Sequence, residues 1–351
     1  MISSCSVVLD DIYFQEKAQF TPVLNSCTVI LEDFHLAKPI TINETHNKTT
    51  PTLCIVPKGL PNPQNHCYIN SVLQIIHRIF IQFRKNINFN NNHEGGLVKS
   101  LMDSICPNTD HNLPHFKLLL AQYDSFFDGV HQQDAYECFL HLLDILHTGT
   151  KENLVDDDLL LENDQCSFSL ITQVFNFTTK RTLQCTVCRY LTISFDESHI
   201  VFTCPSPDTN ITNMLHGSMT STLTKTCHCC HANSKHDETI NIEQPPAVLV
   251  LVINRFDPTM TLKNKDKIIL ERSIMVSSNR YNIIGSIHHH GNTVTSGHYT
   301  SNIYYADSVY TCNDSHILHG THSEPSDSVY MIFYARHDDF TAFSEDGNIL
   351  P

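Results

Sequence analysis

One cysteine in this 351-residue chain lies where a thiol can act as a nucleophile. Cys67 follows a turn rich in proline and asparagine, and the apolar residues after it recur at intervals of three and four as far as Phe83. That spacing predicts an amphipathic helix with Cys67 in its first turn. Asn65 is the expected N-cap, and the partial positive charge at a helix N-terminus favours thiolate over thiol. We therefore predict a reactive, ionised cysteine.

A second residue separates Cys67 from the other cysteines. The chain has 14 cysteines, and the simplest interpretation of any single one is a small buried hydrophobic residue. Asn62, five residues before Cys67, lies on the turn that is expected to fold back over the helix start. Its side-chain amide is suited to donate to a developing oxyanion, a contribution worth about two to three orders of magnitude in rate in other enzymes.

A cysteine nucleophile needs a base close in space, and the base needs a third group that holds its ring. His298 is the favoured base because it follows a glycine and opens a predicted strand, although most of the 23 histidines are expected to be structural or exposed. Asn313 comes fifteen residues later, and antiparallel pairing of the strands that contain the two residues brings it back beside His298. Asp314 is the alternative third group.

Two further cysteine pairs have the spacing of metal ligands. They are Cys185 with Cys188 and, about forty residues later, Cys227 with Cys230. Four thiolates in a β-rich segment suit a tetrahedral zinc ion, and a site filled by four protein ligands leaves no position for substrate. The zinc is therefore expected to be structural. His228 and Cys229 crowd the second pair, so the identity of the fourth ligand stays open.

Three consecutive histidines, His288 to His290, also contain groups that bind metals. Neighbouring residues of a strand point to opposite faces, so at most two of the three can share an ion. A metal site here is the weaker hypothesis.

Sequence periodicity predicts helices in the first half of the chain and strands in the second. Helices are expected at 97–105, 116–123 and 135–146, with loops at 86–96 and around the acidic residues 156–158. Strands are expected at 174–177, 191–195, 200–202, 247–253, 281–287, 298–305 and 329–334, with a loop at 316–327. The unbroken apolar run 247–253 is typical of a strand buried on both faces.

Polar residues open the helix predicted at 135–146. Gln132 and Asp134 lie just before its first apolar residue. They are ordinary capping residues in one interpretation and residues that grip a peptide in a cleft in the other. The local sequence alone does not decide between the two.

Charge and composition narrow the class of partner. The formal net charge is −15, from 22 basic and 37 acidic side chains, and no basic cluster suited to phosphates is present. We therefore do not expect nucleic acid as a partner. Binding of a basic protein or peptide and simple solubility explain the acidic surface equally well. With no secretory signal and no apolar run of membrane-spanning length, we expect an intracellular protein, cytoplasmic or nuclear, without a membrane partner.

Several blocks, in this order along the chain, resemble the ubiquitin-specific proteases. These are GLPNPQNHCYINSVLQ, QQDAYECFLHLLD, the two cysteine pairs, PPAVLVLVINRFD, SGHYTS, CNDS and VYMIFYAR, between about Lys58 and Arg336. The resemblance implies an α+β, papain-like fold shaped as a right hand. A helical thumb would carry Cys67, a β palm would carry His298 and Asn313, and fingers with zinc knuckles would hold the body of ubiquitin.

The same resemblance assigns roles by position. Cys67 matches the nucleophile, Asn62 the oxyanion donor, His298 the base and Asn313 the third member, with Asp314 adjacent. Gln132 and Asp134 match residues that contact the ubiquitin tail. The implied reaction is hydrolysis of the peptide or isopeptide bond after the C-terminal glycine of ubiquitin, with ubiquitin and ubiquitinated proteins as partners.

Departures from the family pattern keep alternatives open. Gln64 replaces the usual glycine before the nucleophile, while Cys138, Val309 and Cys312 replace aromatic residues at packing positions. The first alternative is a pseudoenzyme that binds ubiquitin as an adaptor. The second is a protease for another ubiquitin-like modifier.

The expected domain organisation has three parts. Residues 1–55 are an extension of unknown role, 56–337 form the catalytic domain with fingers at about 174–245, and 338–351 form a polar tail. Nothing in the first part suggests chemistry.

Overall fold

Helix α1 (Cys67–Phe80) is the element around which the helices and the main sheet pack. Its apolar positions are enclosed on nearly every side, with Ile69, Val72 and Ile76 all 0% exposed. The computed structural model describes residues 56–81, 89–104, 112–129, 131–151, 169–205, 209–256, 263–293, 296–305, 308–320 and 325–339. The expected N-terminal extension, the acidic loop at 156–158 and most of the C-terminal tail lie outside these ranges.

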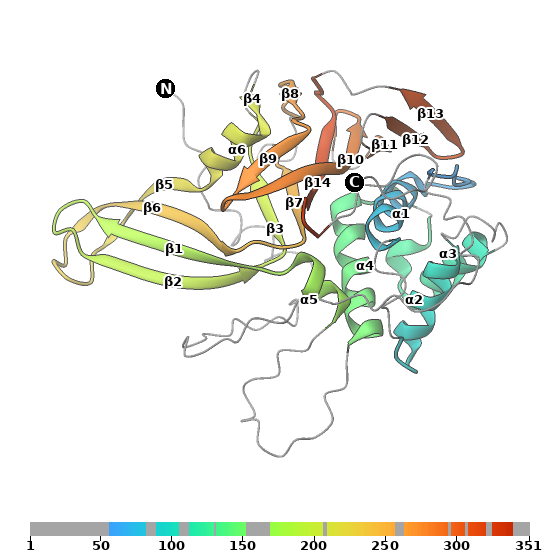
Figure 1. Ribbon diagram of the computed structural model, residues 1–351, viewed down its shortest axis with the longest axis horizontal. Helices are drawn as coiled ribbons and strands as arrows, with labels where there is room; N and C mark the ends of the chain where they lie inside the picture. Colours follow the sequence, from blue (N-terminus) through green and yellow to red (C-terminus); the bar gives the residue numbers. More distant parts are fainter. Residues whose placement is uncertain are drawn as a thin grey trace, which may run out of the picture.

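A helical layer surrounds one side of α1 (Figure 1). It consists of α2 (His93–Ser104), α3 (Asn112–Tyr123), the short 3-10 helix η2 (Ser125–Phe127), α4 (Ala135–Thr150) and α5 (Leu170–Phe175). The loop expected through residue 96 is wrong, because α2 already begins at His93. The side-chain oxygen of Asn92 accepts the Gly95 N–H at 2.7 Å and satisfies a free amide of the first turn.

The other side of α1 packs on an eight-stranded sheet. Its order is β13-β12-β11-β10-β14-β7-β3, with β9 also paired to β10. The strands are β3 (Ile200–Thr203), β7 (Val248–Ile253), β9 (Ser273–Val276), β10 (Asn279–His290), β11 (His298–Tyr304), β12 (Val309–Asn313), β13 (His316–Gly320) and β14 (Val329–Arg336). All of β7 is buried, as the apolar run predicts, while β13 occupies part of an expected loop.

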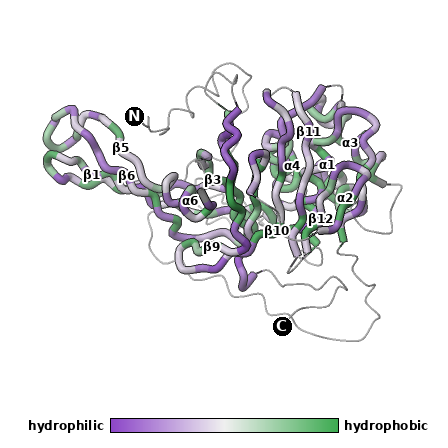
Figure 2. Tube along the Cα trace, turned by 90° about the horizontal axis from the view of Figure 1, so that it is seen from above, coloured by the Kyte–Doolittle hydropathy of each residue, from purple (hydrophilic) through white to green (hydrophobic). Residues whose placement is uncertain are grey.

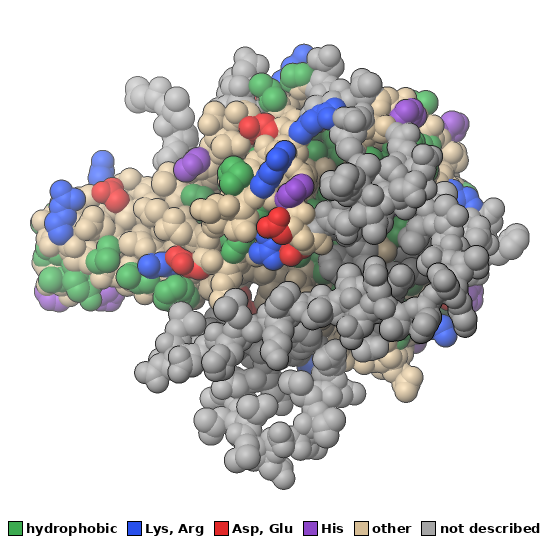
Figure 3. Space-filling model, viewed as in Figure 1, with side chains coloured by type: hydrophobic (Ala, Val, Ile, Leu, Met, Phe, Trp, Pro, Cys, Tyr) green, Lys and Arg blue, Asp and Glu red, His purple; other side chains and the backbone are tan. Residues whose placement is uncertain are grey.

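The second sheet forms an arm that projects from this body (Figures 1 and 2). It contains β1 (Phe177–Cys185), β2 (Leu191–Ser198), β5 (Thr220–Thr226) and β6 (Asn233–Gln244) in the order β2-β1-β6-β5. Helix α6 (Ile211–Ser218) and the short pair β4 (Thr209–Asn210) and β8 (Ile268–Ile269) lie near its base. Alternate residues Leu191, Ile193 and Phe195 of edge strand β2 are exposed, and hydrophobic side chains are visible along the arm (Figure 3).

The strand expected at 174–177 is wrong for most of its length. Ser169 and Thr172 form a capping box that starts α5, and the helix continues to Phe175 before β1 begins at Phe177. A capping box pairs two otherwise unsatisfied amides with side chains, which favours a helical turn over the β-type residues that follow it. The thumb, palm and fingers arrangement of the expected α+β fold is otherwise present.

Candidate active site

Cys67 is the first residue of α1, but the helix is not capped as expected. The N-cap residue is His66, which makes no side-chain capping bond, so the prediction of Asn65 as N-cap is wrong. Asn62 instead closes the turn before the helix, because its side-chain oxygen accepts the backbone N–H of His66 at 2.8 Å. The turn before the helix is thereby closed by the same residue that was expected to serve the oxyanion.

The sulfur of Cys67 is enclosed, with the residue 3% exposed. Burial raises the pKa of the Cys67 thiol, and the nearby Asp314 carboxylate raises it further, against a hydrogen bond from the backbone N–H of Tyr299 that lowers it. The prediction of a thiol ionised by the helix terminus is therefore wrong, because desolvation of the thiolate outweighs the local amides. A buried thiol of this kind needs a base to remove its proton.

His298 begins strand β11, directly before the residue that bonds the Cys67 sulfur. Its Nε2 lies 2.7 Å from the side-chain oxygen of Asn313. The expected hairpin is present, since β11 and β12 pair antiparallel with Ser301 opposite Cys312. Because an amide oxygen only accepts, Nε2 carries the proton in the neutral ring and Nδ1 remains as the basic nitrogen.

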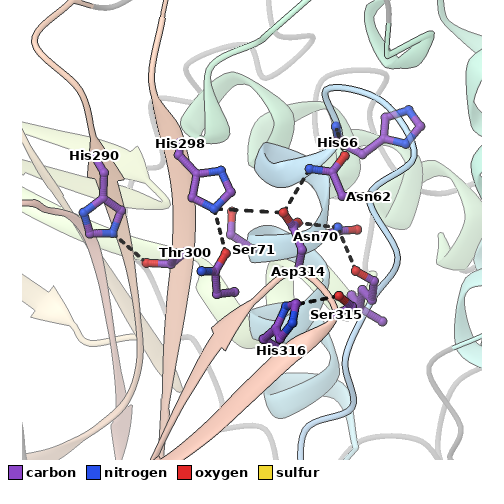
Figure 4. A network of polar contacts seen from close by, with 12 residues as sticks. Asn62, His66, Asn70, Ser71, His290, His298, Thr300, Asp314, Ser315 and His316 are labelled. Atoms are coloured by element: carbon purple, nitrogen blue, oxygen red, sulfur yellow. Dashed lines mark hydrogen bonds and ion pairs between the residues drawn. The ribbon is translucent and has the colours of Figure 1, made fainter.

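Asp314 has a different place from the one that the alternative triad gives it. Its carboxylate is 3.9 Å from His298 Nε2, beyond hydrogen-bond distance, so the geometry favours Asn313 as the orienting group. Its two oxygens instead accept the side-chain amides of Asn62 at 2.9 Å and Asn70 at 2.7 Å (Figure 4). Asp314 thus ties the turn before α1 to the end of β12.

Gln132 lies across from the start of β11. Its side-chain amide donates to the Gly297 carbonyl and accepts the Gly297 N–H, both at 2.9 Å. A Cβ on Gly297 would meet His289 Nε2 at 2.3 Å and the backbone carbonyl oxygen of His290 at 2.8 Å, so the close approach of the backbone at this point requires glycine. Gln132 is exposed and therefore accessible to a peptide in the neighbouring space.

Asp134 is a capping residue. Its Oδ1 accepts the backbone N–H of Tyr136 at 2.7 Å and of Glu137 at 3.2 Å, which starts helix α4. The hydroxyl of Tyr330 donates to its carboxylate at 2.9 Å, and that of Tyr299 at 3.2 Å. Desolvation raises the pKa of the Asp134 carboxyl, against these hydrogen bonds, which lower it. The geometry supports the capping interpretation and gives the peptide-gripping interpretation no support at this residue.

The replacement of glycine by Gln64 does not strain the turn. The described non-glycine residues with positive φ are Arg189, His231, Ser277, Ser278 and Asp314, and Gln64 is absent from this set. Gly129 makes room for the larger side chains, since it has φ +73° and a Cβ there would meet His66 Nε2 at 2.1 Å and Gln64 Oε1 at 2.7 Å. Cys138, Val309 and Cys312 are buried, as expected of packing positions.

The four predicted metal ligands meet at the tip of the arm. The sulfur atoms of Cys185, Cys188, Cys227 and Cys230 all lie within 4.8 Å of one another. Tetrahedral Zn–S bonds of about 2.3 Å place sulfurs about 3.8 Å apart, and two of the observed S–S distances are 3.6 and 4.0 Å. The neighbouring His228 and Cys229 are exposed and outside this set. The cluster therefore fits a metal ion.

Both cysteine pairs have the same backbone turn. Arg189 follows the first pair with φ 63° and His231 follows the second with φ 57°. Each donates its backbone N–H to the carbonyl of the first cysteine of its pair, at 3.0 Å in both cases. Two matching turns at the ends of paired hairpins are a geometry that brings four thiols together.

The histidine run 288–290 has the contacts of structural histidines. His288 Nε2 is 2.9 Å from Ser286 Oγ, and His290 Nε2 is 2.9 Å from Thr300 Oγ1. Burial lowers the pKa of His288 to about 3, which keeps its ring neutral. These partners lie within the main sheet and give the weaker metal hypothesis no support.

Sequence reasoning missed three residues that shape the site. They are Tyr299, Asn70 and Lys117. Asn70 lies one turn after Cys67 on the same face, a spacing that gives a sequence signal for proximity. Tyr299 acts through its backbone N–H, and Lys117 comes from a separate helix, so no sequence motif indicates either residue.

Comparisons with known proteins identify a family. The family described as ubiquitin carboxyl-terminal hydrolase matches residues 58–334. Ubiquitin carboxyl-terminal hydrolase 51 of Mus musculus is 22% identical over 347 residues, with 80% of this chain and 51% of the relative covered. Ubiquitin carboxyl-terminal hydrolase 22 of Homo sapiens is 23% identical over 362 residues, with 83% and 68% covered. The chain thus spans about half the length of the first relative.

Solved structures show the same fold. The SAGA DUB module of Ubp8, Sgf11, Sus1 and Sgf73 bound to monoubiquitin aligns with a TM-score of 0.67 at 18% identity, covering 84% of this chain and 72% of that chain. The module bound to ubiquitin aldehyde aligns with a TM-score of 0.65. Within the described residues, no helix has the length and apolarity needed to cross a membrane. The family match covers well over half of the sequence, and it shows that this chain belongs to the ubiquitin carboxyl-terminal hydrolase family.

Proposed function

We propose that this chain is a thiol-dependent deubiquitinase that hydrolyses the peptide or isopeptide bond after the C-terminal glycine of ubiquitin. One observation carries the proposal: His298, whose Nε2 lies 2.7 Å from Asn313 Oδ1, begins the strand that packs against the helix whose first residue is Cys67. This arrangement supports Cys67 as the nucleophile, His298 as the base and Asn313 as the orienting group. Family membership and the ubiquitin-bound structural neighbours support ubiquitin as the substrate.

The first step is removal of the thiol proton. Because burial keeps Cys67 protonated, Nδ1 of His298 takes this proton as the sulfur attacks the carbonyl carbon of the ubiquitin glycine. The resulting imidazolium is held in place by its Nε2–H bond to Asn313. It then donates the proton to the departing amine, which leaves ubiquitin as a thioester on Cys67.

The second step releases ubiquitin. His298 accepts a proton from water, and the hydroxide equivalent attacks the thioester carbonyl and expels the Cys67 thiolate, which is reprotonated. In both steps negative charge develops on the carbonyl oxygen. Asn62 donates one amide N–H to Asp314, so its second N–H remains for that oxygen.

Ubiquitin would be recognised over a wide surface. Gln132, exposed beside Gly297, is the proposed contact for the ubiquitin tail near the cleft. The exposed apolar row on β2 is a proposed contact for the body of ubiquitin, held by fingers at about 174–245 of a catalytic domain that spans 56–337. The net charge of −15 suits the basic tail of ubiquitin.

We also propose zinc as the ion of the four-cysteine cluster. Cys185, Cys188, Cys227 and Cys230 would hold it, and it would supply structural cross-linking of the two hairpin ends. The fit of the sulfur distances to a tetrahedral ion supports this choice.

A ubiquitin derivative with a C-terminal electrophile tests the proposed activity. We expect one covalent adduct per chain, no adduct with Cys67→Ala, and an unchanged adduct with Cys229→Ser, a matched control at an exposed cysteine outside the site. Tight binding of ubiquitin without an adduct would instead indicate an adaptor. Faster reaction with a probe built on another ubiquitin-like modifier would overturn the substrate.

A further inference from the structure

Lys117 places a cation on the inner face of helix α3. Leu113 and Leu120, one turn before and one turn after it, are 6% and 0% exposed, and Lys117 itself is 8% exposed. Burying an ammonium group is costly unless nearby acceptors and opposite charge compensate it. A methionine would fill the same space without that cost. The contacts of the amine indicate what the charge does.

The amine of Lys117 fixes the orientation of the Asn70 side chain. Its Nζ donates to Asn70 Oδ1 at 2.6 Å and to the Pro61 carbonyl at 3.1 Å. An ammonium group has donors and no acceptor, so the amide of Asn70 must present its oxygen to Lys117. Its NH₂ group is thereby directed to Asp314 Oδ1 at 2.7 Å.

The same reasoning continues from Asp314 to the oxyanion donor. A carboxylate only accepts, so the amide of Asn62 must present its NH₂ group to Asp314 Oδ2, at 2.9 Å. The oxygen of that amide then accepts the His66 N–H at the start of α1. Figure 4 shows Asn62, Asn70 and Asp314 gathered beside His298. Lys117 thus fixes the orientation of Asn70, the Asn70 amide holds one carboxylate oxygen of Asp314, and the other oxygen of Asp314 fixes the orientation of Asn62.

We infer that Lys117 is a positioning residue that acts through Asn70 and Asp314 to hold the Asn62 amide in place, with one N–H on Asp314 and the second N–H left for the oxyanion. The inference deepens the proposed function and rests on it.

The test is a kinetic comparison in two backgrounds. Lys117→Met is made in the wild-type chain and in Asn62→Ala, and hydrolysis of a fluorogenic ubiquitin C-terminal amide is measured as kcat and KM. We expect kcat to fall about tenfold in the wild-type background, the loss of roughly one well-placed hydrogen bond, with KM changed less than twofold. In the Asn62→Ala background the same change should alter kcat less than twofold.

Controls separate this role from a contribution to folding. Lys99→Met, at an exposed position of α2, should retain wild-type kcat. Thermal unfolding shows which variants are folded. If Lys117→Met does not fold, Lys117→Gln, which has a shorter side chain with a neutral donor, replaces it in the comparison of kcat between the two backgrounds. A general structural role would lower kcat by the same factor in both backgrounds and would overturn the inference. So would an unchanged kcat in an active enzyme, whereas an inactive wild-type chain would overturn the proposed function as well.

Discussion

Replacement of Asp134 by alanine should reveal a structural rather than a substrate-binding role. The carboxylate caps α4 through two backbone amides and accepts the hydroxyls of Tyr299 and Tyr330. Loss of an N-cap costs about 1 kcal/mol. Hydrogen bonds to a charged group contribute about 1.5 kcal/mol or more each, and the desolvation of the carboxylate offsets part of this. We expect Asp134→Ala to lower the free energy of unfolding by about 3 kcal/mol.

Urea denaturation followed by circular dichroism measures this quantity. Asp134→Asn is the matched variant, because its amide oxygen can still accept the Tyr136 N–H, and it should cost about 1 kcal/mol. Tyr330→Phe removes one donor and should also cost about 1 kcal/mol. In Asp134→Ala the cost of Tyr330→Phe should nearly vanish, because the hydroxyl has already lost its partner.

A different pattern would refute this reasoning. If Asp134→Ala lost less than 1 kcal/mol of stability while KM for a ubiquitin substrate rose more than tenfold, the carboxylate would act mainly on substrate. The structural interpretation of its contacts would then be wrong.

The remaining predictions concern the nucleophile, the buried lysine and the metal cluster. Burial raises the pKa of Cys67 above its usual value, so the rate of its alkylation by iodoacetamide should keep rising through pH 9. The rate is measured as the difference between the wild type and Cys67→Ser. A plateau below pH 7 would show a preformed thiolate. Burial lowers the pKa of Lys117 from 10.5 to about 8. Between pH 8 and 10.5 the lysine is therefore protonated in the unfolded chain and mostly neutral in the folded one, so the free energy of unfolding should rise with pH in this range. That rise should be about 3 kcal/mol larger in the wild type than in Lys117→Met, as measured by urea denaturation, and equal slopes would contradict the assignment. Elemental analysis should find about one zinc per chain. Cys188→Ser should lose the zinc and unfold at a lower temperature, whereas Cys229→Ser should keep it. A metal-free protein of unchanged stability would exclude a structural ion.

The sequence predicts those parts of the fold that depend on local periodicity. The helix that begins at Cys67 and the buried strand β7 follow directly from their apolar spacing, and both are present. The segment 174–177 has β-type residues, but helix α5, which starts at the capping box of Ser169, covers its first two residues. Its helical state depends on two polar side chains upstream, which the periodicity of the apolar residues does not report.

The candidate site was predictable where residue type fixes the chemistry. His298 and Asn313 meet as expected because one hairpin connects them. The protonation of Cys67 was not predictable, since the helix terminus is a local feature while desolvation depends on packing from the far end of the chain. Lys117 was not predicted for the same reason, because no pattern in its own helix indicates a contact with Asn70.

The attachment of the Cys67 sulfur to a main-chain amide has a practical consequence. The Tyr299 N–H belongs to strand β11 and does not change when the neighbouring imidazole is replaced. Under the proposed function, replacement of His298 by alanine removes the proposed base and leaves the Tyr299 N–H in place. We expect such a variant to bind ubiquitin conjugates without cleaving them.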